Sequence, residues 1–77
     1  MRKIVLPRPT RIYRRIGNSN RLYRTSVMLP EHEVMTIGDE QVLFFNKADQ
    51  RAVPFLDNLG KTYYLLVKEL GLPVLTQ

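Results

Sequence analysis

Arginine side chains that could hold phosphate groups flank a small polar turn near the start of the sequence. Residues 14–24 read RRIGNSNRLYR, with four arginines and no acid. A guanidinium group can bind a phosphate through two parallel hydrogen bonds and can stack on a base, and an asparagine amide can read adenine. These residue types therefore predict contact with nucleic acid. The candidate binding residues are Arg11, Arg14, Arg15, Asn18, Ser19, Asn20, Arg21 and Arg24.

The charge of the sequence divides sharply between its two parts. Residues 1–24 carry eight positive charges and no negative charge, whereas residues 25–77 carry four positive and seven negative charges. The net charge of +5 is therefore the sum of +8 in the first part and −3 in the second. Such asymmetry indicates a polyanionic partner, and nucleic acid rather than a membrane surface, because no long amphipathic helix with a basic face accompanies it.

The sequence offers no set of residues suited to catalysis or to metal binding. His32 is the single histidine, and its neighbours Glu31 and Glu33 point away from it on a turn, so no base and orienting acid are paired. Ser19 and Ser26 have no evident base, and no glycine-rich phosphate loop occurs. Cysteine is absent, which removes disulfides and thiolate metal sites. We predict a protein that is not an enzyme and that needs no metal or cofactor.

The same composition bears on location. No apolar run approaches the roughly 18 residues that cross a bilayer, and the apolar stretch after Met1, Arg2 and Lys3 is too short for a signal peptide. The missing cysteines agree with a reducing compartment. We therefore expect an intracellular, cytoplasmic protein with no membrane partner.

A β-hairpin is the element expected to position the arginines. Residues 10–16 and 21–29 alternate apolar or β-branched side chains with polar ones, as half-buried strands do. Gly17 and the Asn and Ser residues after it have the composition of a tight turn. Before the hairpin, Pro7 and Pro9 predict that residues 1–9 form a basic extended arm that becomes ordered only on binding.

Further strands are expected after Pro30. A short helical turn is predicted for residues 31–36, followed by a buried strand at residues 40–45 and a strand at residues 51–55. Pro54 suggests that this last strand lies at the edge of a sheet, since proline cannot donate to a neighbour. Residues 10–56 are thus predicted to form one β domain.

The clearest helical pattern covers residues 57–71. Asp57 is a good N-cap, Gly71 suits the left-handed position after a helix, and an apolar stripe recurs at helical spacing between them. A tail is expected at residues 72–77. The predicted fold class is therefore mainly β with a C-terminal helix, an α+β protein.

A chain of 77 residues without disulfides has a limited core, and association with a second copy is the remaining means of stabilisation. We therefore predict a homodimer. Its expected interface residues are Val27, Leu29, Val42, Phe44, Leu59, Tyr63, Leu66 and Val67.

Two short segments resemble the MazE-like branch of the AbrB/SpoVT swapped-hairpin proteins. Residues 15–19, RIGNS, resemble that family's strand and loop before its DNA-facing turn, and VMLP at residues 27–30 with IGDEQV at residues 37–42 resembles its core. The resemblance covers residues 11 to 55. It implies an intertwined homodimer, in which two chains interleave their hairpins into one β-barrel-like unit that binds DNA. It also implies a cationic role for the hairpin arginines and places Asn18 and Ser19 in the DNA-facing loop.

The leading hypothesis is a sequence-specific or semi-specific double-stranded DNA-binding protein that acts as a transcriptional regulator or antitoxin. One alternative is a small RNA-binding or ribosome-associated β-barrel protein, with Tyr13 and Tyr23 stacking on bases. Another is a protein-interaction module that uses the apolar stripe of the C-terminal helix to hold a protein partner.

Overall fold

The protein folds into strands that precede one short helix. The computed structural model describes residues 1–46 and 48–74. The elements over these residues are β1 (Arg2–Val5), β2 (Thr10–Arg15), β3 (Leu22–Leu29), β4 (Val34–Ile37), β5 (Val42–Phe45), β6 (Asp49–Leu56), β7 (Thr62–Leu66) and α1 (Val67–Leu70). The prediction of a mainly β protein with a C-terminal helix is confirmed at this level.

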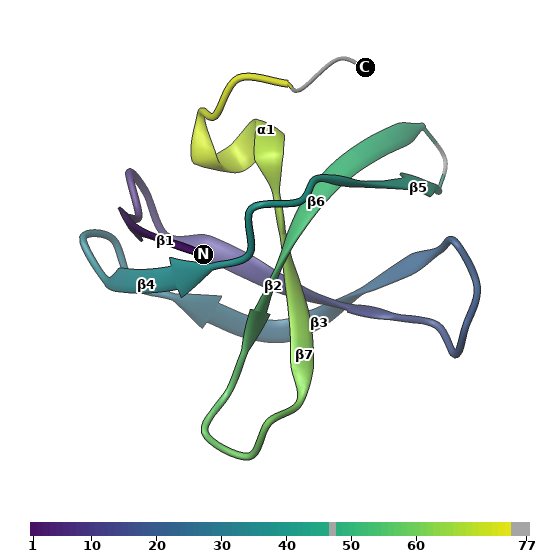
Figure 1. The fold of residues 1–77 in the computed structure, drawn as a ribbon, viewed down its shortest axis with the longest axis horizontal. Helices are drawn as coiled ribbons and strands as arrows, with labels where there is room; N and C mark the ends of the chain where they lie inside the picture. Colours follow the sequence, from purple (N-terminus) through teal and green to yellow (C-terminus); the bar gives the residue numbers. More distant parts are fainter. Residues whose placement is uncertain (47, 75–77) are drawn as a thin grey trace.

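The strands form two antiparallel sheets (Figure 1). The larger sheet has the strand order β3-β2-β7-β6-β5, and the smaller sheet pairs β1 with β4. The hairpins β2–β3, β5–β6 and β6–β7 supply most of the larger sheet, and the pair Tyr13 and Tyr64 joins β2 to β7. Strand β7 comes last in the chain but lies at the centre of the sheet, so the basic first part of the chain meets the later part there.

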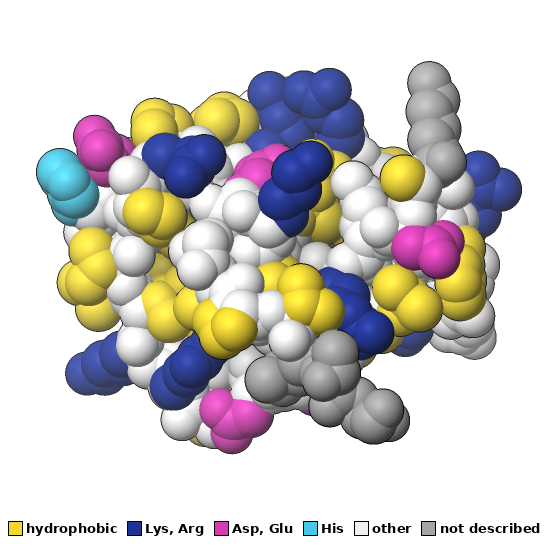
Figure 2. All heavy atoms as spheres, turned by 90° about the horizontal axis from the view of Figure 1, so that it is seen from above, with side chains coloured by type: hydrophobic (Ala, Val, Ile, Leu, Met, Phe, Trp, Pro, Cys, Tyr) yellow, Lys and Arg dark blue, Asp and Glu magenta, His cyan; other side chains and the backbone are white. Residues whose placement is uncertain are grey.

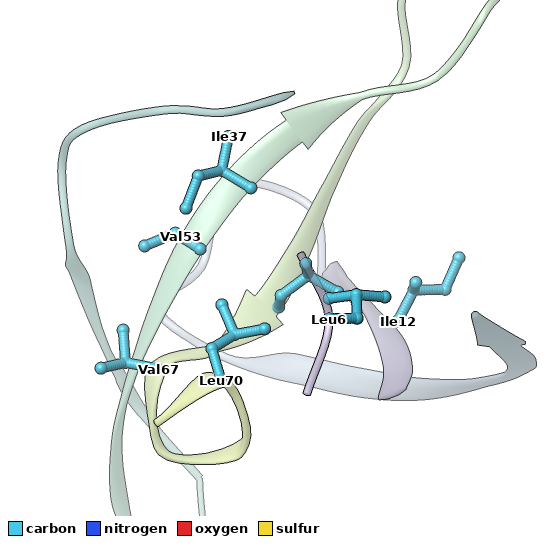
Figure 3. Close-up of a cluster of buried hydrophobic side chains, with 7 residues drawn as sticks. Leu6, Ile12, Ile37, Val53, Val67 and Leu70 are labelled. Carbon is cyan, nitrogen blue, oxygen red and sulfur yellow. The ribbon is translucent and has the colours of Figure 1, made fainter. Parts of the chain in front are cut away.

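Both faces of the larger sheet bury apolar side chains. Because successive residues of a strand point to opposite faces, the neighbours Ile12 and Tyr13 enter different clusters. The cluster around Ile12 also contains Leu6, Ile37, Val53, Leu65, Val67 and Leu70 (Figure 3). The cluster around Tyr13 also contains Leu22, Phe44, Ala52, Tyr64 and Leu66. The first cluster thus joins the larger sheet to the β1–β4 sheet and α1, while the second lies on the other face.

The first nine residues are not an arm that waits for a partner, so that prediction is wrong. Strand β1 pairs with β4 along its whole length, from Arg2 opposite Ile37 to Val5 opposite Val34. Leu6 is fully buried, and its backbone N–H donates to the Glu33 carbonyl at 2.9 Å. The burial of Leu6 in the first cluster and the pairing of β1 with β4 together hold this segment in place.

The helix expected over residues 57–71 is wrong for most of its length, because Thr62–Leu66 is strand β7 and only Val67–Leu70 is helical. Asp57 does not cap a helix: its Oδ1 accepts from the N–H groups of Leu59 and Lys61, both at 2.8 Å, and so closes the β6–β7 turn. Gly71 does adopt the predicted left-handed conformation, with φ of 68°. A strand buried on both faces has a continuous apolar run, which produces apolar residues at helical spacing by coincidence.

Two smaller predictions also differ from the structure. Residues after Pro30 form a tight turn, in which His32 has φ of 71°, and then continue as β4 rather than as a helical turn. Strand β6 lies between β7 and β5 instead of at the edge. Pro54 is tolerated because β5 pairs only with residues 49–52 of β6, and beyond them Gly38 donates its N–H to the Pro54 carbonyl at 2.8 Å.

Candidate nucleic-acid interface

The predicted β2–β3 hairpin is present, and its turn is closed by local hydrogen bonds. The N–H of Ile16 donates to the Arg21 carbonyl at 2.9 Å, and Gly17 takes the left-handed φ of 51° that the turn needs. Both the N–H and the Oγ of Ser19 donate to the Ile16 carbonyl, at 3.0 and 2.6 Å. Ser19 therefore shapes the turn, while Asn18 next to it is exposed.

This turn is also fixed to the β5–β6 hairpin. The N–H of Phe45 donates to the Asn20 carbonyl at 2.7 Å, and the N–H of Leu22 donates to Asn46 Oδ1 at 3.0 Å. Two hydrogen bonds thus join the start of β3 to the end of β5, the two outer strands of the larger sheet. The hairpin tip is consequently held at a defined place instead of projecting alone.

A bulge in β3 fixes the position of the Arg11 side chain. The register changes from Arg11 opposite Met28 to Tyr13 opposite Arg24, so one residue of β2 faces three residues of β3. Thr25 stabilises the bulge, because its Oγ1 donates to the Ile12 carbonyl at 2.9 Å. The Thr25 carbonyl in turn accepts from Arg11 Nη1 at 2.8 Å. The bulge therefore fixes the Arg11 side chain beside β3.

Arg8, Arg11 and Arg24 line one open pocket, which we call the basic pocket; Pro9, Tyr13, Met28 and Glu69 complete its lining. Burial and then the nearby Glu69 carboxylate raise the pKa of Tyr13 above its ordinary value of 10.0, while Arg24 and Arg11 act in the opposite direction. Among residues 1–46 and 48–74, no arginine forms an ion pair with a carboxylate. The pocket thus combines three unpaired cations with one acid.

The adjacent Arg14 and Arg15 stack on aromatic rings at opposite faces of β2. Arg14 Cζ lies 5.0 Å from the centre of the Tyr63 ring, and Arg15 Cζ lies 5.2 Å from the centre of the Phe44 ring. Arg15 Nε is buried and has no hydrogen-bond partner. Cation–π contacts of this kind hold a guanidinium group in position while leaving its edge free to bind an anion.

The candidate arginines therefore do not share one face. Strand alternation puts Arg11 and Arg15 on one side of β2 and Arg14 on the other, with Arg24 paired across from Tyr13 on the first side. Figure 2 shows Lys and Arg side chains at separate places on the molecule, with apolar side chains between them. Asn18, Asn20 and Arg21 are exposed at the hairpin turn, away from the pocket-lining residues.

The residues predicted for a dimer interface occupy different environments in the chain. Phe44, Leu66 and Val67 are buried in the two clusters of the chain itself. Val27 and Leu59 are exposed, with 47% and 83% of their surface accessible. The others, Leu29, Val42 and Tyr63, are partly buried against the clusters.

Sequence reasoning missed Glu69 as part of the site and did not include Arg8 among the candidate binding residues. Glu69 was expected on a long helix that does not form, so nothing in the pattern placed it near the hairpin. Arg8 precedes strand β2 and lines the pocket from the segment between Pro7 and Pro9, which was expected to belong to an extended arm.

The searches for related proteins and for other kinds of site give negative results. No protein-family model, curated protein or solved structure matches this chain. In the described part of the chain, no group of His, Cys, Asp and Glu residues is arranged to hold a metal ion. The same residues include no helix with the length and apolar character needed to span a bilayer.

Proposed function

We propose that this protein binds double-stranded DNA through the β2–β3 hairpin and the basic pocket. The observation that carries the proposal is the pocket itself, where Arg8, Arg11 and Arg24 line an open depression and none of them forms an ion pair with Glu69, the one acid in the lining. Three cations that converge in this way repel one another, and an anion between them relieves the repulsion. Phosphate fits this role because guanidinium groups can bind it through paired hydrogen bonds.

The hairpin turn supplies a second part of the proposed contact. A two-stranded ribbon can enter the DNA major groove, where asparagine and arginine side chains reach base edges. Asn18, Asn20 and Arg21 are exposed at the turn, and the hydrogen bonds of Ser19 and Asn46 hold it in one conformation. A turn that is already ordered loses less conformational entropy on binding.

The proposal includes a homodimer that regulates transcription, as the resemblance to the swapped-hairpin family implies. Strand β3 is an outer strand of the larger sheet, and it exposes Val27 and Met28, with 47% and 46% of their surface accessible. Pairing along β3, or exchange of the β2–β3 hairpin between two chains, would cover these side chains. Light scattering of the protein with and without a short duplex measures the mass of the assembly and tests this part.

The salt dependence of DNA binding tests the pocket directly. Each phosphate neutralised contributes about −0.9 to the slope of log affinity against log salt, so one phosphate held by the three arginines of the pocket gives about −0.9 per chain. A variant with both Arg8→Gln and Arg24→Gln should bind a fluorescein-labelled duplex more weakly, with a slope less steep by up to about 0.9 per chain.

The matched control for this experiment removes the same charge elsewhere. A variant with both Arg51→Gln and Lys61→Gln loses two positive charges from residues that do not line the basic pocket. It should keep the wild-type slope. If both double variants change the slope equally, the charge acts without a specific site, and if the wild-type affinity does not depend on salt, DNA binding by this protein is refuted.

A further inference from the structure

A row of aromatic side chains and one arginine crosses four strands of the larger sheet. Phe55 of β6 pairs with Tyr63 of β7, and Arg14 of β2 pairs with Tyr23 of β3. The pairing of Tyr13 with Tyr64 places Arg14 beside Tyr63 and so joins the two pairs. We call Phe55, Tyr63, Arg14 and Tyr23 the aromatic row.

Contacts along the row hold it together. The rings of Phe55 and Tyr63 are stacked, with their centres 5.7 Å apart and their planes 26° from parallel. Arg14 Cζ lies 5.0 Å from the centre of the Tyr63 ring. Ring, ring and guanidinium group therefore follow one another across adjacent strands and end at Tyr23 on the outer strand β3.

The aromatic row lies at the border between the buried part and the solvent-exposed part of this face of the sheet. Two residues away along their strands, on the same face, Val53, Leu65 and Ile12 are buried in the first cluster. In the row itself burial falls, and Tyr23 has 48% of its surface accessible. The row therefore borders solvent at the β3 end while its other end supports the core.

The chemistry of the accessible end favours a nucleic-acid base over an apolar partner. Tyr23 and Arg14 come from the acid-free residues 1–24. Arg14 donates no hydrogen bond to a protein acceptor in the described part of the chain, so its guanidinium edge can bind a phosphate. At the far end of the row, Glu33 and Asp57 line the depression beside Phe55, where they would repel a phosphate.

We propose that the β3 end of the aromatic row binds an unpaired base of single-stranded nucleic acid, with the base stacked on Tyr23 and its phosphate on Arg14. Aromatic residues on an open sheet face bind unpaired bases in this way, with little dependence on sequence. A paired base inside a duplex does not expose its face, so this site differs from the basic pocket in the form of nucleic acid that it takes. The stacking site rests on the proposed function in one respect, which is that nucleic acid is the partner.

Fluorescence anisotropy with two matched oligonucleotides tests the proposal. One is a labelled oligothymidylate of about 12 nucleotides, a length within the range that small single-strand-binding domains cover. The other has the same length and the same phosphates but abasic sugars throughout. The wild-type protein should bind the oligothymidylate more tightly than the abasic strand, by roughly fivefold or more, because one base stacked on an aromatic ring contributes at least that factor.

Variants then locate the contact. Tyr23→Ala should remove the preference for the strand with bases, and Tyr23→Phe should keep it because the ring remains. Phe45→Ala is the matched control, since Phe45 is also an exposed aromatic residue of an outer strand, with 49% of its surface accessible, but lies outside the row. The control should leave the preference unchanged.

The outcomes separate this inference from the proposed function. If the wild-type protein binds both strands equally, or if Tyr23→Ala keeps the preference, the stacking site is refuted while phosphate binding at the basic pocket stands. If the protein binds oligothymidylate with the expected preference but does not bind duplex DNA, the proposed function fails and the stacking site stands. If the protein binds none of the three probes at low salt, neither the duplex, nor the oligothymidylate, nor the abasic strand, both the proposed function and the stacking site are refuted.

Discussion

Replacing Glu69 by glutamine should tighten binding to DNA. Glu69 is the one acid in the lining of the basic pocket, so the change raises the formal charge of the lining from +2 to +3. A phosphate held about 6 Å from this carboxylate would be repelled by about 0.7 kcal/mol even at the dielectric constant of water. Glu69→Gln should therefore raise the affinity for a short duplex by at least about threefold at low salt.

The assay is fluorescence anisotropy at low and at moderate salt, with Glu40→Gln as the control. Glu40 is exposed and does not line the pocket, so its replacement changes the net charge equally but should affect binding less. A second measurement is independent of DNA: because Glu69 contributes to the raised pKa of Tyr13, the variant should shift that pKa downward in an absorbance titration. Equal affinities of wild type and Glu69→Gln, together with the expected pKa change, would show that no phosphate enters the pocket.

Three further predictions concern stability. Gly38→Ala should lower the free energy of unfolding in urea by about 1–3 kcal/mol, because its Cβ would lie 2.9 Å from Pro54 Cγ; an unchanged value would mean that the two segments separate easily. The raised pKa of Tyr13 means that the folded state favours the neutral side chain, so the contribution of Tyr13 to the free energy of unfolding is complete below pH 10 and is lost as pH rises through the folded pKa. Tyr13→Phe should therefore lose less stability than the wild type between neutral pH and pH 11. Equal losses in the two proteins would contradict this prediction. Arg15→Met should raise stability by about 1 kcal/mol in the same urea assay, since it removes a buried Nε without a partner and keeps an apolar stem on Phe44; a loss of stability would show that Nε is satisfied.

The hairpin and its end points could be predicted from the sequence because local signals agree there. Gly17 and the polar residues after it specify a turn, Pro30 limits the second strand, and period-two alternation marks both strands. In the structure β2 and β3 lie within the predicted residues 10–16 and 21–29. Local chemistry was sufficient for the two strands and their turn, whereas the register from Tyr13 back to Thr10 depends on the β3 bulge.

The last element could not be assigned correctly because its surroundings decide it. Residues 62–66, TYYLL, are apolar or aromatic at nearly every position, a run that suits either a buried helix or a central strand. Only the pairing of β7 with both β6 and β2 makes it a strand.

The composition of the candidate site was only partly visible in the sequence for a related reason. The arginines could be found by type, but whether they share a face depends on strand alternation and on the β3 bulge. Separated residues such as Glu69 and Tyr63 reach the hairpin only because β7 pairs with β2 and α1 follows directly after β7. Long-range pairing of this kind has no local signal.

The pairing between β2 and β7 is the shortest in the larger sheet. The pair Tyr13 and Tyr64 is the single matched position between these strands, whereas β6 and β7 share five. Two strands that share so few paired positions separate before the neighbouring strand pairs do. Release of the β2–β3 hairpin, the motion that hairpin exchange between two chains requires, would break this one pair and the two hydrogen bonds that join the start of β3 to the end of β5, and would leave the pairing within the β5–β6–β7 meander unchanged.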